Sequence, residues 1–199
     1  MRTTLLIALA STSLGAAIAL APVHAAPVQE AGKPYVQDTQ RGMTRVVYFG
    51  NDGVSGEYAI EFGKPQWKAE FEQQIEKSKG KRLRLGNDYW TTLDTFCPLS
   101  IGGKDLKPGL YFLALDLSAK GEWSLVTLDP EPLRKVRFDA FGSAQTKGGT
   151  DCPMAHEATK DPADSLSIRF IADEKDSRQQ TLEIRFGKHR LTAPVKPKA

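Results

Sequence analysis

The chain has 199 residues, with 27 Lys or Arg against 24 Asp or Glu, which gives a formal net charge of +3 at pH 7. Charges of both signs are mixed along the chain, so the sequence lacks the basic stripe of a nucleic-acid-binding protein and excludes that class. The length fits one domain with its own hydrophobic core.

Residues 1–25 have the pattern of a secretory signal peptide. The positive residue Arg2 precedes an apolar run that continues to Leu20, and residues 23–25 supply small side chains at the positions that a signal peptidase recognises. We therefore expect cleavage before Ala26 and export to the periplasm or the extracellular space. No later segment is apolar for long enough to cross a bilayer, so no membrane span is expected after cleavage.

Residues 26–44 are rich in polar residues, Gly and Pro, and predict a flexible N-terminal arm. Residues 45–199 then predict a single β-rich domain. A first strand is predicted over 46–49, and a Gly-Asn-Asp-Gly turn follows it. Residues 57–62 alternate apolar and polar side chains, which predicts a half-buried strand.

The apolar period then changes to that of a helix. Trp67, Phe71 and Ile75 recur every four residues, and Gly80 supplies a C-terminal stop. We expect one amphipathic helix over 65–79 on the outside of a sheet, with Trp67 fixing it there.

The rest of the chain is typical of short antiparallel strands with turn residues between them. Residues 110–117 are almost continuously apolar and predict a strand buried on both faces, and Trp123 in the next strand is expected in the core. Cys97-Pro98 predicts a break in a strand, and residues 129–164 predict irregular structure. The fold class is therefore an antiparallel β-sandwich or partly open barrel. Its later strands are predicted over 91–101, 110–117, 122–128, 166–171, 181–186 and 190–195, with turns at 118–121 and 187–188.

A Gly-Gly hairpin within residues 101–111 carries a resemblance. Its sequence, Ile-Gly-Gly-Lys-Asp-Leu-Lys-Pro-Gly-Leu-Tyr, resembles the hallmark hairpin of an exported bacterial family catalogued as a domain of unknown function, number twenty-nine eleven in that series. Three other stretches agree with the family in order along the chain: Phe-Gly-Lys-Pro at 62–65, Arg-Leu-Gly-Asn-Asp at 84–88, and the closing pairs at 186–187 and 194–195.

The resemblance covers residues 57–195 and implies a β-rich exported domain. It implies no substrate, and no catalytic residue is carried over. The chain departs from the family at Asp88, where Asn is usual, and at Phe186, where Trp is common. The helix-like insert is longer than the usual connection, and Cys97 and Cys152 lie outside the family's pattern.

Cys97 and Cys152 are the only two cysteines of the chain. A lone pair in an oxidising compartment usually bonds, so we expect a structural disulfide between them. Closing so long a loop would stabilise the fold by roughly 4 kcal/mol.

A copper site is the alternative use of the same sulfur atoms. Cys152, Met154 and His156 place a thiolate, a thioether and an imidazole within five residues, and these soft ligands suit copper. Cys97 would complete the set, and His189 is the remaining imidazole in the mature chain. This alternative competes directly with the disulfide.

A hydrolase is the second alternative, with His156 as the base. Asp151 and Glu157 lie beside it in the sequence as acids that would orient its ring. The chain has neither a Gly-x-Ser-x-Gly elbow nor a His-Glu-x-x-His motif, and His189 is expected in a surface turn.

Aromatic residues suggest a binding surface. Tyr89 and Trp90 follow a Gly-Asn-Asp turn, and in a regular strand one of the two must face outward. Together with Arg84 and Asp88 they form the candidate binding surface, suited to stacking on a sugar ring.

The sequence therefore favours an exported, non-enzymatic envelope or ligand-binding module with no required cofactor. Its expected partner is an envelope glycan or protein, not a nucleic acid.

Overall fold

The structure is a computed structural model that describes residues 36–49 and 55–198. The predicted signal peptide, most of the predicted arm and the turn at 50–53 lie outside these residues. All helices and strands belong to the unit that begins at Asp38. In chain order they are β1 (Arg41–Phe49), β2 (Ser55–Gly63), α1 (Glu70–Glu76), β3 (Lys81–Arg84), β4 (Thr91–Thr95), β5 (Leu99–Ile101), β6 (Lys104–Leu106), β7 (Gly109–Leu117), β8 (Trp123–Leu128), α2 (Pro130–Lys135), the 3-10 helix η1 (Ala140–Gln145), β9 (Thr150–Ala172) and β10 (Gln180–Pro197).

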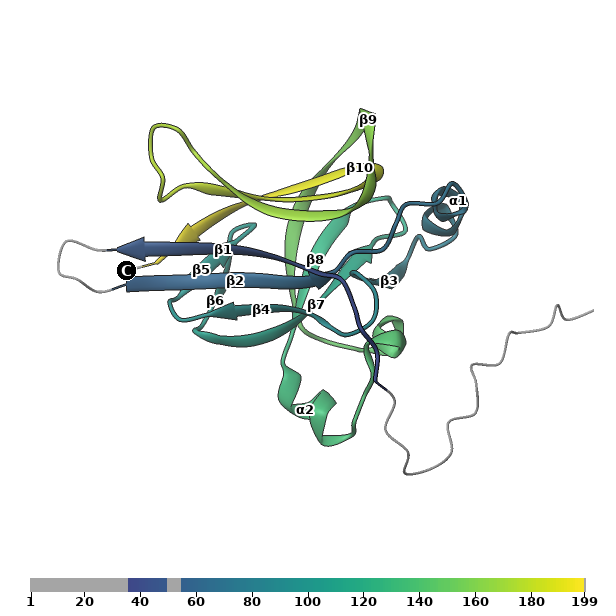
Figure 1. Ribbon diagram of the computed structural model, residues 1–199, viewed down its shortest axis with the longest axis horizontal. Coiled ribbons are helices and arrows are strands. Elements are labelled where there is room, and N and C mark those ends of the chain that lie inside the picture. The colour runs from purple at the N-terminus through teal and green to yellow at the C-terminus, as the bar shows by residue number, and fades with distance from the viewer. Residues whose placement is uncertain (1–35, 50–54, 199) are drawn as a thin grey trace, which may run out of the picture. The chain divides into compact units, whose positions relative to one another are not determined.

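The strands form one large antiparallel sheet that does not close into a barrel, which confirms the mainly β, antiparallel fold class (Figure 1). The strand order is β1-β2-β4-β7-β8-β9-β10-β5-β6. β3 pairs with the C-terminal half of β7 and β4 with its N-terminal half. β3 and β4 therefore flank the same edge of β7, and residues 85–90 form the bend between them.

The long strand β9 joins the two halves of the sheet. Its first residues pair with β8, where Met154 lies opposite Trp123, and the rest of the strand pairs with β10. In Figure 1 the β9–β10 hairpin lies above β1 and β2. The backbone N–H of Phe170 on β9 donates to Thr44 Oγ1 on β1 at 3.2 Å, and the Phe170 ring meets Tyr58 on β2 edge to face at 5.0 Å. The main hydrophobic core lies between these two layers.

The apolar strand β7 is buried on both faces, as its sequence predicted. Leu113 and Leu115 belong to the main core. Phe112 and Ala114 point to the other face, where they form a second cluster with Trp90 and with residues around α2 and η1. The helical segment after β8 therefore covers the outer face of β7.

The prediction of irregular structure over 129–164 was wrong. Asp129 accepts a hydrogen bond from the Glu131 backbone N–H and begins α2, and Asp139 caps η1 in the same way. Residues from Thr150 onward already belong to β9.

Two further boundaries differ from the predictions. The last two predicted strands are one strand, β10, and the expected turn at 187–188 is a shift of register within it. The first strand begins at Arg41, so residues 41–44 are not part of an arm.

The predicted helix is present but shorter. The segment before α1 pairs with β9 instead, through a bridge between Gln66 and Ser165. No helix within the described ranges 36–49 and 55–198 is long and apolar enough to cross a membrane.

Candidate functional site

A cavity of about 500 Å³ lies between α1 and the inner face of the sheet, and we name it the α1 pocket. Its walls are mainly apolar and come from elements far apart in the chain. Seven elements contribute, and one lining residue from each is Ile75 (α1), Leu83 (β3), Leu115 (β7), Trp123 (β8), Phe141 (η1), Leu166 (β9) and Ile184 (β10). The pocket therefore exists only once the whole sheet has assembled.

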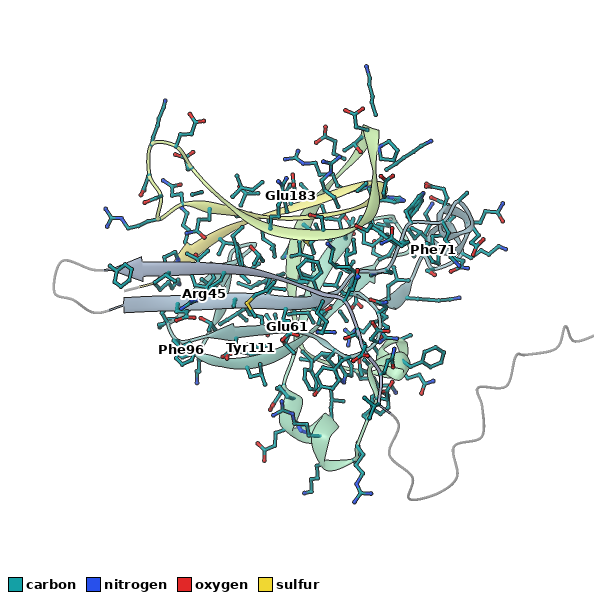
Figure 2. All side chains as sticks on the ribbon, in the orientation of Figure 1. Arg45, Glu61, Phe71, Phe96, Tyr111 and Glu183 are labelled. Carbon is teal, nitrogen blue, oxygen red and sulfur yellow. The ribbon has the colours of Figure 1, made fainter. Side chains whose placement is uncertain are left out.

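Trp67 fixes α1 over the pocket, as the sequence predicted. Its ring meets Phe71, labelled on α1 in Figure 2, at 5.9 Å, and Phe186 on β10 at 4.8 Å, both edge to face. The Trp67 backbone N–H also donates to the Asp164 carbonyl at 2.7 Å. Gly187 lies directly beneath the indole, where a Cβ atom would overlap the ring. A glycine in β10 thus permits the close approach that seats the helix.

Arg84 brings a positive charge to the wall of the pocket. One guanidinium nitrogen, Nη2, donates to the Asp88 carbonyl. The buried Nε has no hydrogen-bond partner among the described residues. Burial lowers the pKa of Arg84, with a further lowering from Arg41, and these two effects outweigh the opposing effects of Asp139 and Asp88.

The bend between β3 and β4 divides the predicted binding surface. Arg84 and Asp88 do come together, at the edge of the pocket. Tyr89 is exposed, whereas Trp90 is 3% exposed and stacks on Phe112 at 4.7 Å. One of the two aromatic residues faces outward, as predicted, but Trp90 belongs to the second cluster of the core and not to a surface.

Two histidines from β9 and β10 meet beside the pocket. His156 Nε2 lies 3.1 Å from His189 Nδ1, and the ring centroids are 5.2 Å apart. The other nitrogen of His189, Nε2, lies 3.4 Å from Glu72 Oε1 on α1, an ion-pair contact longer than a well-formed hydrogen bond. His189 Nε2 is buried and forms no hydrogen bond with any described residue, so its contact with Glu72 is electrostatic only. Burial, and then the charge of His189, lower the pKa of His156.

The expectation of a surface turn at His189 was wrong. The residue lies within β10, and its side chain is 14% exposed. The two histidines are 33 residues apart, so only the pairing of β9 with β10 brings them together.

The predicted copper ligands lie along one face of β9. Cys152 is fully buried opposite Leu125, Met154 is 7% exposed, and His156 is exposed. Four residues of extended strand separate Cys152 from His156 by about 13 Å. The part of the chain that the structure describes has no group of three or more His, Cys, Asp or Glu side chains that could hold a metal ion. The copper alternative stays a prediction, but the structure spreads its ligands along the strand.

The two cysteines are free thiols in the structure, which differs from the predicted disulfide. Cys152 Sγ lies 3.9 Å from the Thr150 carbonyl oxygen, and Cys97 Sγ lies 4.0 Å from Thr95 Oγ1. Each sulfur therefore contacts a residue of its own segment, two positions earlier. Burial is the main reason that the pKa of Cys152 is raised to about 11.

The folded, reduced protein should show one reactive and one unreactive thiol. At pH 8 the raised pKa leaves Cys152 with about 100-fold less thiolate than an ordinary thiol, and its side chain is inaccessible. We expect a disulfide reagent such as DTNB to label Cys97 rapidly and Cys152 only on unfolding. The variants Cys97→Ser and Cys152→Ser assign the two phases. Equal labelling rates would contradict the burial of Cys152, and no free thiol in unreduced, denatured protein would support the disulfide.

Comparison of the chain with protein-family models, with curated proteins and with solved structures finds no match. The resemblance carried by the hairpin at 101–111 stays a prediction.

Proposed function

We propose that this protein is a non-enzymatic module that binds a small, mainly apolar molecule in the α1 pocket. The pocket itself is the observation that carries the proposal. Its volume of about 500 Å³ falls within the range of small-molecule sites, and its walls are mainly apolar with a few polar groups. Export by the signal peptide at 1–25 belongs to the proposal and places this binding outside the cytoplasm.

The chemistry of the walls favours an apolar ligand over a glycan. Sugars need many hydrogen-bond partners, whereas Leu83, Leu115, Leu166 and Ile184 offer packing surface only. Tyr89 is exposed outside this wall, and Trp90 is unavailable for stacking because it lies in the core.

The hydrolase alternative has less support. His156 and His189 bond to each other, and His189 also contacts Glu72. No hydroxyl or thiol bonds to either ring in the parts of the chain that the structure describes, so the pair lacks a nucleophile to activate. The hydrolase stays a prediction.

Filling the pocket should weaken binding. Ile75 lines the pocket from α1 and is only half-buried, so Ile75→Trp inserts an indole while the helix can still adjust. We expect the affinity for the neutral fluorescent probe N-phenylnaphthylamine to fall at least tenfold, roughly 1.4 kcal/mol. Titration of the probe at constant protein concentration measures this change.

Gln73→Trp is the matched control, because Gln73 lies on the same helix, is exposed and does not line the pocket. This variant should bind the probe like the original protein. Failure of the original protein to bind any apolar probe, or equal binding by Ile75→Trp, would overturn the proposed function.

A further inference from the structure

We propose that the ligand is an amphipathic carboxylic acid whose carboxylate is held by Arg84 and whose hydrocarbon chain fills the α1 pocket. This inference rests on the proposed function and names its ligand class. Three features of the wall carry it: its charge, an unused hydrogen-bond donor and its apolar interior.

The charge of the wall is unbalanced. Arg84 is the one Lys or Arg among the lining residues that the structure describes, and none of those residues is Asp or Glu. A permanent cation in a mainly apolar cavity selects for a ligand with a negative group. His189, the other residue of the wall that can carry a charge, would add to the positive potential when protonated.

The Arg84 guanidinium has one hydrogen-bond donor that no described residue uses. Arg84 uses Nη2 to hold the Asp88 carbonyl, while Nε is buried without a partner among the described residues. A buried donor without an acceptor is unfavourable, and a ligand oxygen would satisfy it. A planar carboxylate matches the fork of a guanidinium better than a single hydroxyl group does.

A second cation, Arg41, lies close to Arg84. Arg41 lowers the pKa of Arg84. It donates from Nε to Glu61 at 2.5 Å and from Nη2 to the Trp90 carbonyl at 2.8 Å. Its Nη1 is buried and has no hydrogen-bond partner in the part of the chain that the structure describes. Asp88 and Asp139 oppose this positive charge in part. Because burial is the largest influence on Arg84, an arriving carboxylate would meet a cation that water solvates poorly.

The rest of the cavity suits a hydrocarbon chain. With its carboxylate on Arg84, the ligand's hydrocarbon chain would contact Leu83, Leu115 and Ile184 on the sheet. On the other side it would contact Phe71 and Ile75 of α1. Burial of this chain supplies affinity, and the pairing with Arg84 supplies the preference for an acid over an alcohol.

Displacement of N-phenylnaphthylamine by decanoate and by decanol tests the inference. The two compounds share their chain and differ in the head group. We expect the original protein to bind decanoate about tenfold more tightly than decanol, because only the acid pairs with the guanidinium. In Arg84→Gln this preference should fall to within about twofold, because the carboxylate loses its charged partner. Arg84→Lys, which keeps the charge and loses the fork, should retain part of the preference.

Lys81→Gln is the control for long-range charge, because it removes a cation from the exposed start of β3, outside the pocket. It should keep the full preference for decanoate. Equal affinity for decanoate and decanol in the original protein, or an undiminished preference in Arg84→Gln, would overturn the inference and leave the proposed function standing. If neither the probe nor either compound bound the original protein, the proposed function would fail with it.

Discussion

Replacing Gly187 with alanine is expected to destabilise the protein by about 3 kcal/mol and to loosen the α1 pocket. Gly187 has φ +55°, a left-handed conformation that costs other residues roughly 1–2 kcal/mol. The new Cβ atom would also overlap the Trp67 ring, and such crowding adds about 1–3 kcal/mol. Because Trp67 seats α1, we expect weaker binding of N-phenylnaphthylamine together with the lower stability. Urea unfolding measures the first effect and probe titration the second.

Gly103→Ala separates the two causes. Gly103 also has a left-handed φ, +77°, but a Cβ atom there would meet nothing within 4 Å. This variant should lose only the backbone part, about 1 kcal/mol, and should bind the probe normally. Equal losses in the two variants would show that contact with Trp67 is not the cause.

Replacing Glu183 with alanine is expected to lower the free energy of unfolding by about 2 kcal/mol. Figure 2 labels Glu183 on β10, where its side chain is 5% exposed and accepts hydrogen bonds from Arg169 Nη2 and Arg190 Nε, each at 2.6 Å. Removal of the carboxylate leaves two cations side by side without their shared partner. Breaking a fully buried pair costs roughly 3–5 kcal/mol, and the partial exposure of the two arginines reduces this figure.

The contribution of Glu183 should depend on pH in a defined direction. Burial raises the pKa of the carboxyl, but the hydrogen bonds from Arg169 and Arg190 outweigh burial and hold the pKa below its usual value. A lowered folded-state pKa means that the stabilisation is complete above the unfolded pKa of about 4.3. It is lost as the pH falls through the folded value. The stability difference between the original protein and Glu183→Ala should therefore be constant near neutral pH and shrink in acid.

Glu157→Ala is the control for this prediction. Glu157 accepts from the same Arg190 at 2.9 Å, but its side chain is 64% exposed. An exposed pair of this kind contributes about 0–1 kcal/mol. A loss as large as that of Glu183→Ala, or a Glu183 effect that grows in acid, would contradict the argument from burial.

Local sequence predicted the strands whose burial alternates or is continuous. The apolar run of β7, the turn after it and the return of β8 depend on neighbours in the chain, and all three are present. The first half of β9 was missed because most side chains between Ala155 and Asp164 are exposed, so burial imposes no apolar period there. Gly187 was taken for a turn because a positive φ suits a turn and a bulge equally well.

The candidate site was harder to predict than the strands, because it depends on pairing between segments that are far apart in the sequence. Arg84 and Asp88 were found because they flank a turn, and that local signal was sufficient. The burial of Trp90 in place of Tyr89 could not be deduced, because alternation along a strand requires only that one of the two residues face inward. The pocket walls come from seven elements, and no local pattern brings Leu83 and Ile184 to the same cavity.

The pairing of β10 with β5 also bears on how fast the chain folds. Val195 lies opposite Ile101, 94 residues earlier, whereas β5 and β6 pair across a two-residue turn. The entropy of closing a loop grows with its length, and folding rates fall as contacts become more distant in sequence. We therefore expect the β5–β6 hairpin to form early in folding. The pairing of β5 with the end of β10 should form later. A refolding experiment should find this pairing in the slowest step, after the local hairpins have formed.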